Sequence, residues 1–88
     1  MKEAFLIVEA RAISSSEWLV KGRAYEDVKV GDTLFILIHE VSNVEAFKIV
    51  KLETYGGPVT VLNRMLTGEI TLHGRNGETL LYSKILMI

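Results

Sequence analysis

The sequence predicts an all-β fold, a small closed antiparallel β-barrel of about six or seven strands. Three observations lead to this prediction. Short stretches of alternating or continuous apolar residues recur along the chain. Turn-forming groups separate them, among them Gly31-Asp32, Gly56-Gly57-Pro58 and Asn76-Gly77. The stretches also follow one another too closely to leave room for the crossover helices of a βαβ fold.

Length and composition predict one folded domain over residues 1–88. Apolar residues make up 49% of the chain, which is enough for the core of a small domain. The net charge of −1 argues against strong nonspecific binding of nucleic acid, which needs a concentrated positive face. Cysteine is absent, so disulfides and thiolate chemistry are excluded. The apolar start is too short for a membrane span or a signal sequence, and we expect a soluble cytoplasmic protein.

Residues 5–13 alternate with a period of two, which predicts a half-buried first strand. Its apolar face consists of Leu6, Val8, Ala10 and Ala12. A polar turn at residues 14–17 leads into a second strand over residues 18–25, and the two strands are expected to form a hairpin. Gly22 inside the second strand indicates a bulge or another backbone that passes close by.

The chain then turns a corner at residues 28–34. We expect Val28 and Val30 to anchor one side of it, Gly31 to take a positive φ and Asp32 to hydrogen-bond the turned backbone. A third strand over residues 33–39 follows, nearly continuous in apolar residues, as in the centre of a closed sheet. A turn is predicted at residues 40–43.

Residues 45–55 leave two alternatives open. Ser42 and Glu45 fit a helix capping box, and Val44, Phe47 and Lys51 share one face of such a helix. A strand is favoured by residues 49, 50, 54 and 55, which are Ile, Val, Thr and Tyr. We expect the strand.

The C-terminal third is expected to add three strands. Residues 59–62 form a short strand, residues 63–68 a loop, and residues 69–73 a strand with Ile70 and Leu72 inward. Asn76-Gly77 predicts a type I′ hairpin. The final strand, over residues 79–87, is apolar on both faces, which leaves homodimerisation through this strand open.

Gly22-Arg23, followed by Val28-Lys29-Val30-Gly31-Asp32 and a further strand, resembles the second domain of translational GTPases, the family of elongation factor Tu. Thr67-Gly68-Glu69, leading into a strand that ends at Gly74, is similar to another step of that barrel. The resemblance implies a translation-factor barrel that docks on a protein or a ribonucleoprotein, and it adds to the preference for a strand at residues 45–55. No Walker-type phosphate loop is present, so the sequence resembles the barrel alone.

Three functional hypotheses follow. The first is a non-enzymatic interaction module with no cofactor and no metal, docking on a protein or ribonucleoprotein. The second is a small RNA-binding barrel, and for either partner the candidate contacts are Lys21, Arg23, Tyr55, Arg64, His73 and Arg75. The third is a small enzyme or ligand carrier with its site in the barrel mouth, which is disfavoured because no nucleophile, base and stabiliser occur at a fitting spacing.

The remaining polar residues have simpler explanations. His39 and His73 lack metal-ligand partners at the required spacing, so we expect ordinary strand histidines. Asp27, Asp32 and Glu26 are explained better by turn chemistry than by a cation site, and Ser14-Ser15-Ser16 by a solvated turn.

Overall fold

The computed structural model describes residues 1–37 and 44–88. These residues form nine strands and a short 3₁₀ helix. They are β1 (Glu3–Ala12), β2 (Glu17–Ala24), β3 (Val28–Lys29), β4 (Thr33–Leu37), β5 (Val44–Thr54), β6 (Gly57–Val59), β7 (Val61–Leu62), β8 (Thr67–His73), the helix η1 (Gly77–Leu81) and β9 (Ile85–Met87). The predicted turn at residues 40–43 lies outside the described residues, as do His39 and Ser42.

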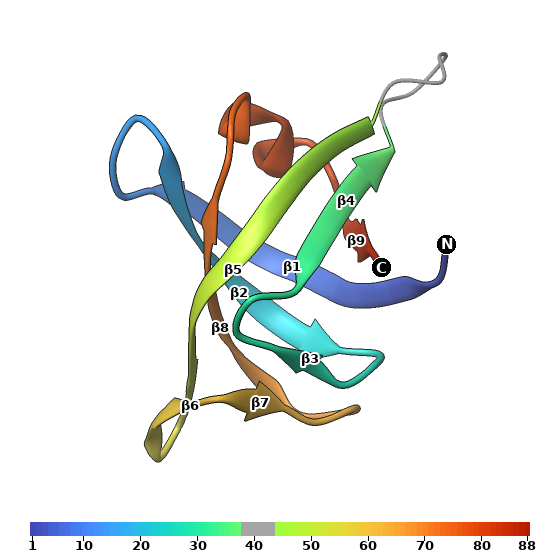
Figure 1. The fold of residues 1–88 in the computed structure, drawn as a ribbon, viewed down its shortest axis with the longest axis vertical. Helices are drawn as coiled ribbons and strands as arrows, with labels where there is room; N and C mark the ends of the chain where they lie inside the picture. Colours follow the sequence, from blue (N-terminus) through green and yellow to red (C-terminus); the bar gives the residue numbers. More distant parts are fainter. Residues whose placement is uncertain (38–43) are drawn as a thin grey trace.

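Six of the strands close into an antiparallel barrel (Figure 1). They follow one another in the order β4, β9, β1, β2, β8, β5, and β5 pairs with β4 again to complete the ring. β6 adds a further strand to the edge of β5, and β3 pairs with β7 as a separate two-stranded ribbon. The prediction of a small closed antiparallel barrel is confirmed.

Residues 44–54 form a strand and not a helix. β5 is bonded along one edge to β4 and along the other to β8, and β6 joins its C-terminal end. Phe47, Ile49 and Leu52 are buried inside the barrel, whereas Lys48 and Lys51 are exposed. The hydrogen bonds to β4 and β8 satisfy the backbone N–H and C=O groups of β5. The strand is therefore the correct alternative, and the helix is not formed.

The core fills the inside of the ring with side chains from nearly every strand. Ile70 and Leu72 of β8 are buried, as predicted, and so are Trp18, Val20 and Ala24 of β2. The other buried hydrophobic residues are Ala4, Phe5, Val28, Leu34, Ile36, Phe47, Ile49, Leu52, Leu62, Leu80 and Leu86. A core shared among so many strands makes the barrel wall a firm support for surface residues.

The predicted buried face of the first strand is wrong. Ala4 and Phe5 are buried next to each other, whereas Val8 is 73% exposed. The cause lies in two irregularities of pairing: the register with β9 shifts between Glu3 and Phe5, and the register with β2 shifts between Ile7 and Glu9. Each shift changes the phase of the alternation, so a strict period of two does not hold along β1.

The corner after β3 is mostly as predicted. Gly31 has a φ of 99°, and the Lys29 N–H donates to Asp32 Oδ2 at 3.0 Å. Val28 is buried, but Val30 is exposed, so the prediction that both valines anchor the corner is wrong for Val30. Val30 belongs to the turn itself, where its N–H donates to the Thr60 carbonyl and its side chain faces away from the core.

The C-terminal segment differs most from its prediction. Asn76 has a φ of 56°, but Gly77 begins the helix η1, so the type I′ hairpin is wrong. The final strand is also shorter than predicted, because β9 covers only Ile85–Met87. η1 packs across the end of the barrel and buries Leu80 in the core, which leaves Tyr82 exposed where the helix ends.

Candidate protein-docking groove

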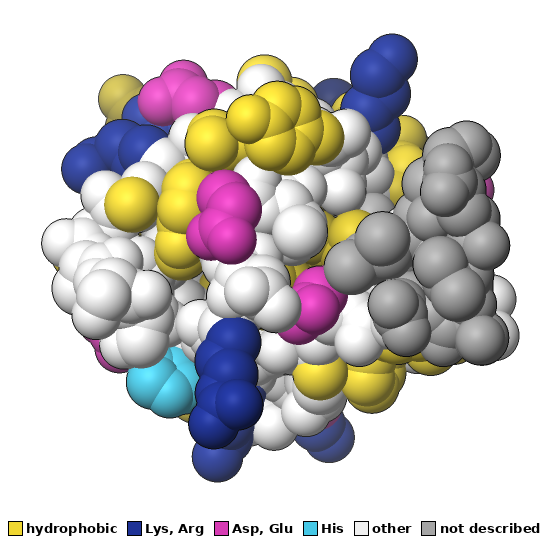
Figure 2. All heavy atoms as spheres, turned by 90° about the horizontal axis from the view of Figure 1, so that it is seen from above, with side chains coloured by type: hydrophobic (Ala, Val, Ile, Leu, Met, Phe, Trp, Pro, Cys, Tyr) yellow, Lys and Arg dark blue, Asp and Glu magenta, His cyan; other side chains and the backbone are white. Residues whose placement is uncertain are grey.

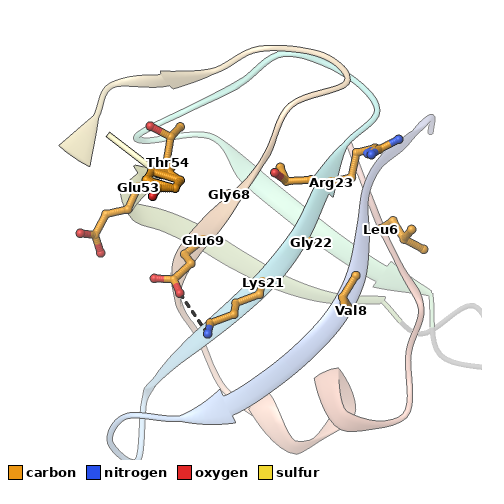
Figure 3. Close-up of a pocket in the computed structure, with 11 residues that line it drawn as sticks. Leu6, Val8, Lys21, Gly22, Arg23, Glu53, Thr54, Gly68 and Glu69 are labelled. Carbon is orange, nitrogen blue, oxygen red and sulfur yellow. Dashed lines mark ion pairs between the residues drawn. The ribbon is translucent and has the colours of Figure 1, made fainter. Parts of the chain in front are cut away.

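A groove of about 610 Å³ runs across the outside of the barrel, over β1, β2, β8 and the end of β5 (Figure 3). It is lined by Leu6, Val8, Lys21, Gly22, Arg23, Glu53, Thr54, Tyr55, Thr67, Gly68 and Glu69. Residues from four strands therefore contribute, and the two central strands supply its floor.

Two facing glycines lie at the centre of the groove. Gly22 of β2 pairs directly with Gly68 of β8. A Cβ on Gly22 would overlap the carbonyl oxygen of Leu6, and one on Gly68 would lie 2.7 Å from the carbonyl oxygen of Glu53. Because neither glycine has a side chain, the backbone of β1 can approach Gly22 and the backbone of β5 can approach Gly68. The groove lies over this closely packed part of the barrel wall. The predicted close approach at Gly22 is confirmed.

Apolar and aromatic side chains stand at the two ends of the groove. Leu6 and Val8 project from β1 at one end, and the register shift at Val8 turns this valine outward (Figure 3). Tyr55 belongs to the other end, where the chain turns from β5 into β6, and it is fully exposed. Leu6 is half-buried and Val8 is exposed, and an exposed tyrosine is a typical contact residue of protein interfaces.

The charges that line the groove are balanced. Lys21 Nζ lies 3.4 Å from Glu69 Oε2, and just outside the groove Lys51 Nζ lies 3.7 Å from Glu53 Oε1. Two cations, Lys21 and Arg23, therefore face two carboxylates, Glu53 and Glu69, and the four charges sum to zero. Such a surface lacks the concentrated positive charge that attracts a phosphate backbone.

The structure brings together three of the six candidate contact residues. Lys21, Arg23 and Tyr55 line the groove, and the position of Tyr55 beside the two β2 residues could not be read from the sequence. Arg64 lies in the loop before β8, where its backbone N–H donates to Asp27 Oδ1 at 2.7 Å.

His73 and Arg75 lie away from these residues. His73 ends β8 and pairs with Glu17 and Lys48. The groove reaches Glu69 on β8, and the four residues from Glu69 to His73 span about 13 Å, which separates the groove from His73 and from Arg75 beyond it. The six residues therefore do not form one continuous patch.

The barrel end that carries η1 has a mixed surface. Figure 2 shows basic, acidic and hydrophobic side chains interspersed on this face. No single-sign field covers the described part of the face, so it offers no clear electrostatic platform.

The turn-chemistry interpretation is confirmed for Asp27, Asp32 and Ser14. Asp27 and Asp32 accept backbone N–H groups, and Ser14 Oγ accepts those of Ser16 and Glu17 at 3.3 and 3.2 Å. Within residues 1–37 and 44–88, no group of three or more His, Cys, Asp or Glu residues is placed to hold a metal ion. In the same residues, no helix is long and apolar enough to cross a membrane.

Sequence reasoning missed Leu6, Val8 and the glycine pair as components of a site. The usable signal was a pair of strand glycines beside charged residues, in Lys21-Gly22-Arg23 and Gly68-Glu69. Recognising the groove also requires knowing that these two glycines face each other, which depends on the pairing of β2 with β8.

Comparison of the chain with protein-family models, with curated proteins and with solved structures gave no match. The fold and the site define a small closed β-barrel with a glycine-floored groove on its outer wall.

Proposed function

We propose that this chain is a non-enzymatic docking module that binds a protein partner in the groove over Gly22 and Gly68. The observation that carries the proposal is the composition of the groove, which combines exposed apolar and aromatic side chains with balanced charge. In this proposal the barrel recognises its partner by surface complementarity.

The energetics of the groove favour a protein over a nucleic acid. Covering Leu6, Val8 and Tyr55 removes apolar surface from water, which stabilises a complex by about 25 cal/mol per Å² before the costs of association are subtracted. An RNA backbone gains little here, because Glu69 is paired with Lys21 and the lining residues together carry no net charge.

The support beneath the groove suits rigid docking. The groove is built on strands whose inner faces are buried in the common core. Val20 of β2 and Ile70 of β8, for example, pair with each other and are fully buried. A binding surface on paired strands keeps its shape, so little conformational entropy is lost when a partner binds. The resemblance to the translation-factor barrel is in line with such a role, since that barrel serves as a docking domain.

A matched pair of tyrosine variants tests the proposal. Tyr55 lines the groove and Tyr82 follows η1 outside it, and both are strongly exposed. We expect the immobilised wild-type barrel to retain a protein from a lysate of its source, and purified partner to bind Tyr55→Ala about tenfold more weakly than Tyr82→Ala. Equal affinity of the two variants, or retention abolished by ribonuclease, overturns the proposal.

A further inference from the structure

Arg23 differs from the other charged residues of the groove. Lys21 and Glu69 form an ion pair inside it, and Glu53 is paired with Lys51. Among the described residues, the Arg23 guanidinium makes no ion pair and no side-chain hydrogen bond. The groove as a whole is neutral, but it contains one uncompensated cation with a planar set of donors.

A hydroxyl group stands next to this cation. Arg23 of β2 pairs directly with Thr67 of β8, and both side chains line the groove. Directly opposite residues on one face have Cβ atoms about 5 Å apart, so the guanidinium and the hydroxyl reach the same small acceptor. A carboxylate is the acceptor that fits both, because arginine binds it through two parallel N–H donors and a hydroxyl adds a third.

The surroundings decide which kind of carboxylate fits. Leu6 lies on one side of Arg23, and Glu53 and Thr54 at the end of β5 lie on the other, as Figure 3 shows. A polypeptide that follows the groove therefore continues past Arg23 in both directions. Its carboxylate comes from an Asp or Glu side chain and not from the end of the chain.

Resting on the proposed function, we propose that the groove binds an extended segment of a partner protein that carries an acidic side chain. Arg23 and Thr67 hold this carboxylate, and an aliphatic side chain next to it in the partner covers Leu6 and Val8. A single acidic side chain of the partner is complementary to Arg23, the one uncompensated charge of the groove. A polyanion would also lie next to the carboxylates of Glu53 and Glu69, which are unfavourable neighbours for it.

Selection from a library of random twelve-residue peptides displayed on phage, with the wild-type barrel as bait, tests this inference. We expect the enriched peptides to share an Asp or Glu beside an aliphatic residue.

One enriched peptide is then synthesised with an amidated C-terminus, together with its Asp→Asn or Glu→Gln counterpart. Both peptides are titrated into ¹⁵N-labelled wild-type protein and into Arg23→Gln and Arg75→Gln variants. Arg75 is the matched control, since it is an exposed arginine beyond the far end of β8.

The two peptides should shift the Gly22 and Gly68 amides of the wild-type protein, with the acidic one binding about tenfold more tightly. This difference should vanish in Arg23→Gln and persist in Arg75→Gln. Binding in the groove without this acid dependence, or only with a free C-terminus, overturns the acidic-side-chain inference and leaves the docking proposal standing.

Two other results overturn both proposals together. One is the absence of any enriched peptide that shifts groove amides. The other is a structured RNA that shifts them in its place, with an affinity that falls steeply as salt rises, because such salt dependence marks phosphate contacts.

Discussion

The indole ring of Trp18 lies against the α-carbon of Gly77, so close that a Cβ at position 77 would overlap the Nε1 and Cδ1 atoms of the ring. This contact joins the start of β2 to the start of η1, nearly sixty residues later in the chain. It holds η1 across the barrel end, where Leu80 enters the core. The packing of Trp18 on Gly77 thus places η1 at this end of the barrel.

Replacing Gly77 by alanine should destabilise the barrel. The added methyl group forces Trp18 or η1 to move, and overpacking of this kind costs about 1–3 kcal/mol in the free energy of unfolding. Urea denaturation measures the loss. Gly56→Ala is the control, because a Cβ there meets no atom within 4 Å. Equal stability of the two variants would show that the indole has room to yield.

Gly22→Ala should be more damaging than Gly77→Ala. At Gly22 the obstacle is the Leu6 carbonyl group, which is backbone, with the Phe5 ring 2.8 Å away. A backbone atom of a paired strand cannot rotate aside, so β1 and β2 must separate locally. We expect loss of the dispersed amide NMR spectrum of the folded barrel, or a destabilisation greater than about 3 kcal/mol.

Comparing Gly22→Ala with Gly31→Ala separates the effect of a steric clash from that of an unfavourable backbone φ. Gly31 has a φ of 99° but open space around it, so alanine there meets strain without a clash. The expected cost is about 1–2 kcal/mol, and the variant should remain folded. If Gly31→Ala proves the more damaging of the two substitutions, the close approach at Gly22 does not limit stability.

The sequence predicted the elements whose signals are local. β2 was predicted as a strand from its own residues, its pairing with β8 has no register shift, and Trp18, Val20 and Ala24 on one of its faces are buried. The corner at Gly31 was also predictable, since a positive φ and an aspartate acceptor are properties of adjacent residues. For β5, the strand was preferred over the helix because of the β propensity of its own residues and because of the resemblance to the translation-factor barrel.

Features that depend on contacts between distant segments were not predictable. Asn76-Gly77 gives a hairpin signal, but in the structure Gly77 packs against Trp18 of a distant strand and begins η1. The register shift after Ile7 reverses which side chains of β1 face outward. The groove likewise depends on Gly22 facing Gly68, which only the strand order reveals.

The hydrogen bond between Asp27 and the Arg64 amide joins two loops that are far apart in sequence. Asp27→Ala removes the acceptor, and we expect a loss of about 1 kcal/mol in the free energy of unfolding, together with faster hydrogen exchange at the Arg64 amide. Asp27→Asn keeps a carbonyl oxygen at the same place and should lose less on both measures. Unchanged exchange at Arg64 in Asp27→Ala would mean that the loop is held by other contacts, such as the Met65 N–H to the Ala24 carbonyl.

The charge balance of the groove predicts how its selectivity can be changed. Replacing Glu53 and Glu69 by glutamine removes both carboxylates while Lys21 and Arg23 keep their charges, so the lining changes from neutral to +2. This double variant should bind single-stranded RNA more tightly than the wild type, and its affinity should fall more steeply with salt, by up to about two counterions released. The Lys21–Glu69 pair is partly exposed, so its loss should cost less than about 1 kcal/mol of stability.

The control variant, Glu3→Gln with Glu78→Gln, makes the same change in net charge outside the groove. If both double variants gain RNA affinity equally, the overall charge of the barrel governs the binding, and the position of the two carboxylates does not.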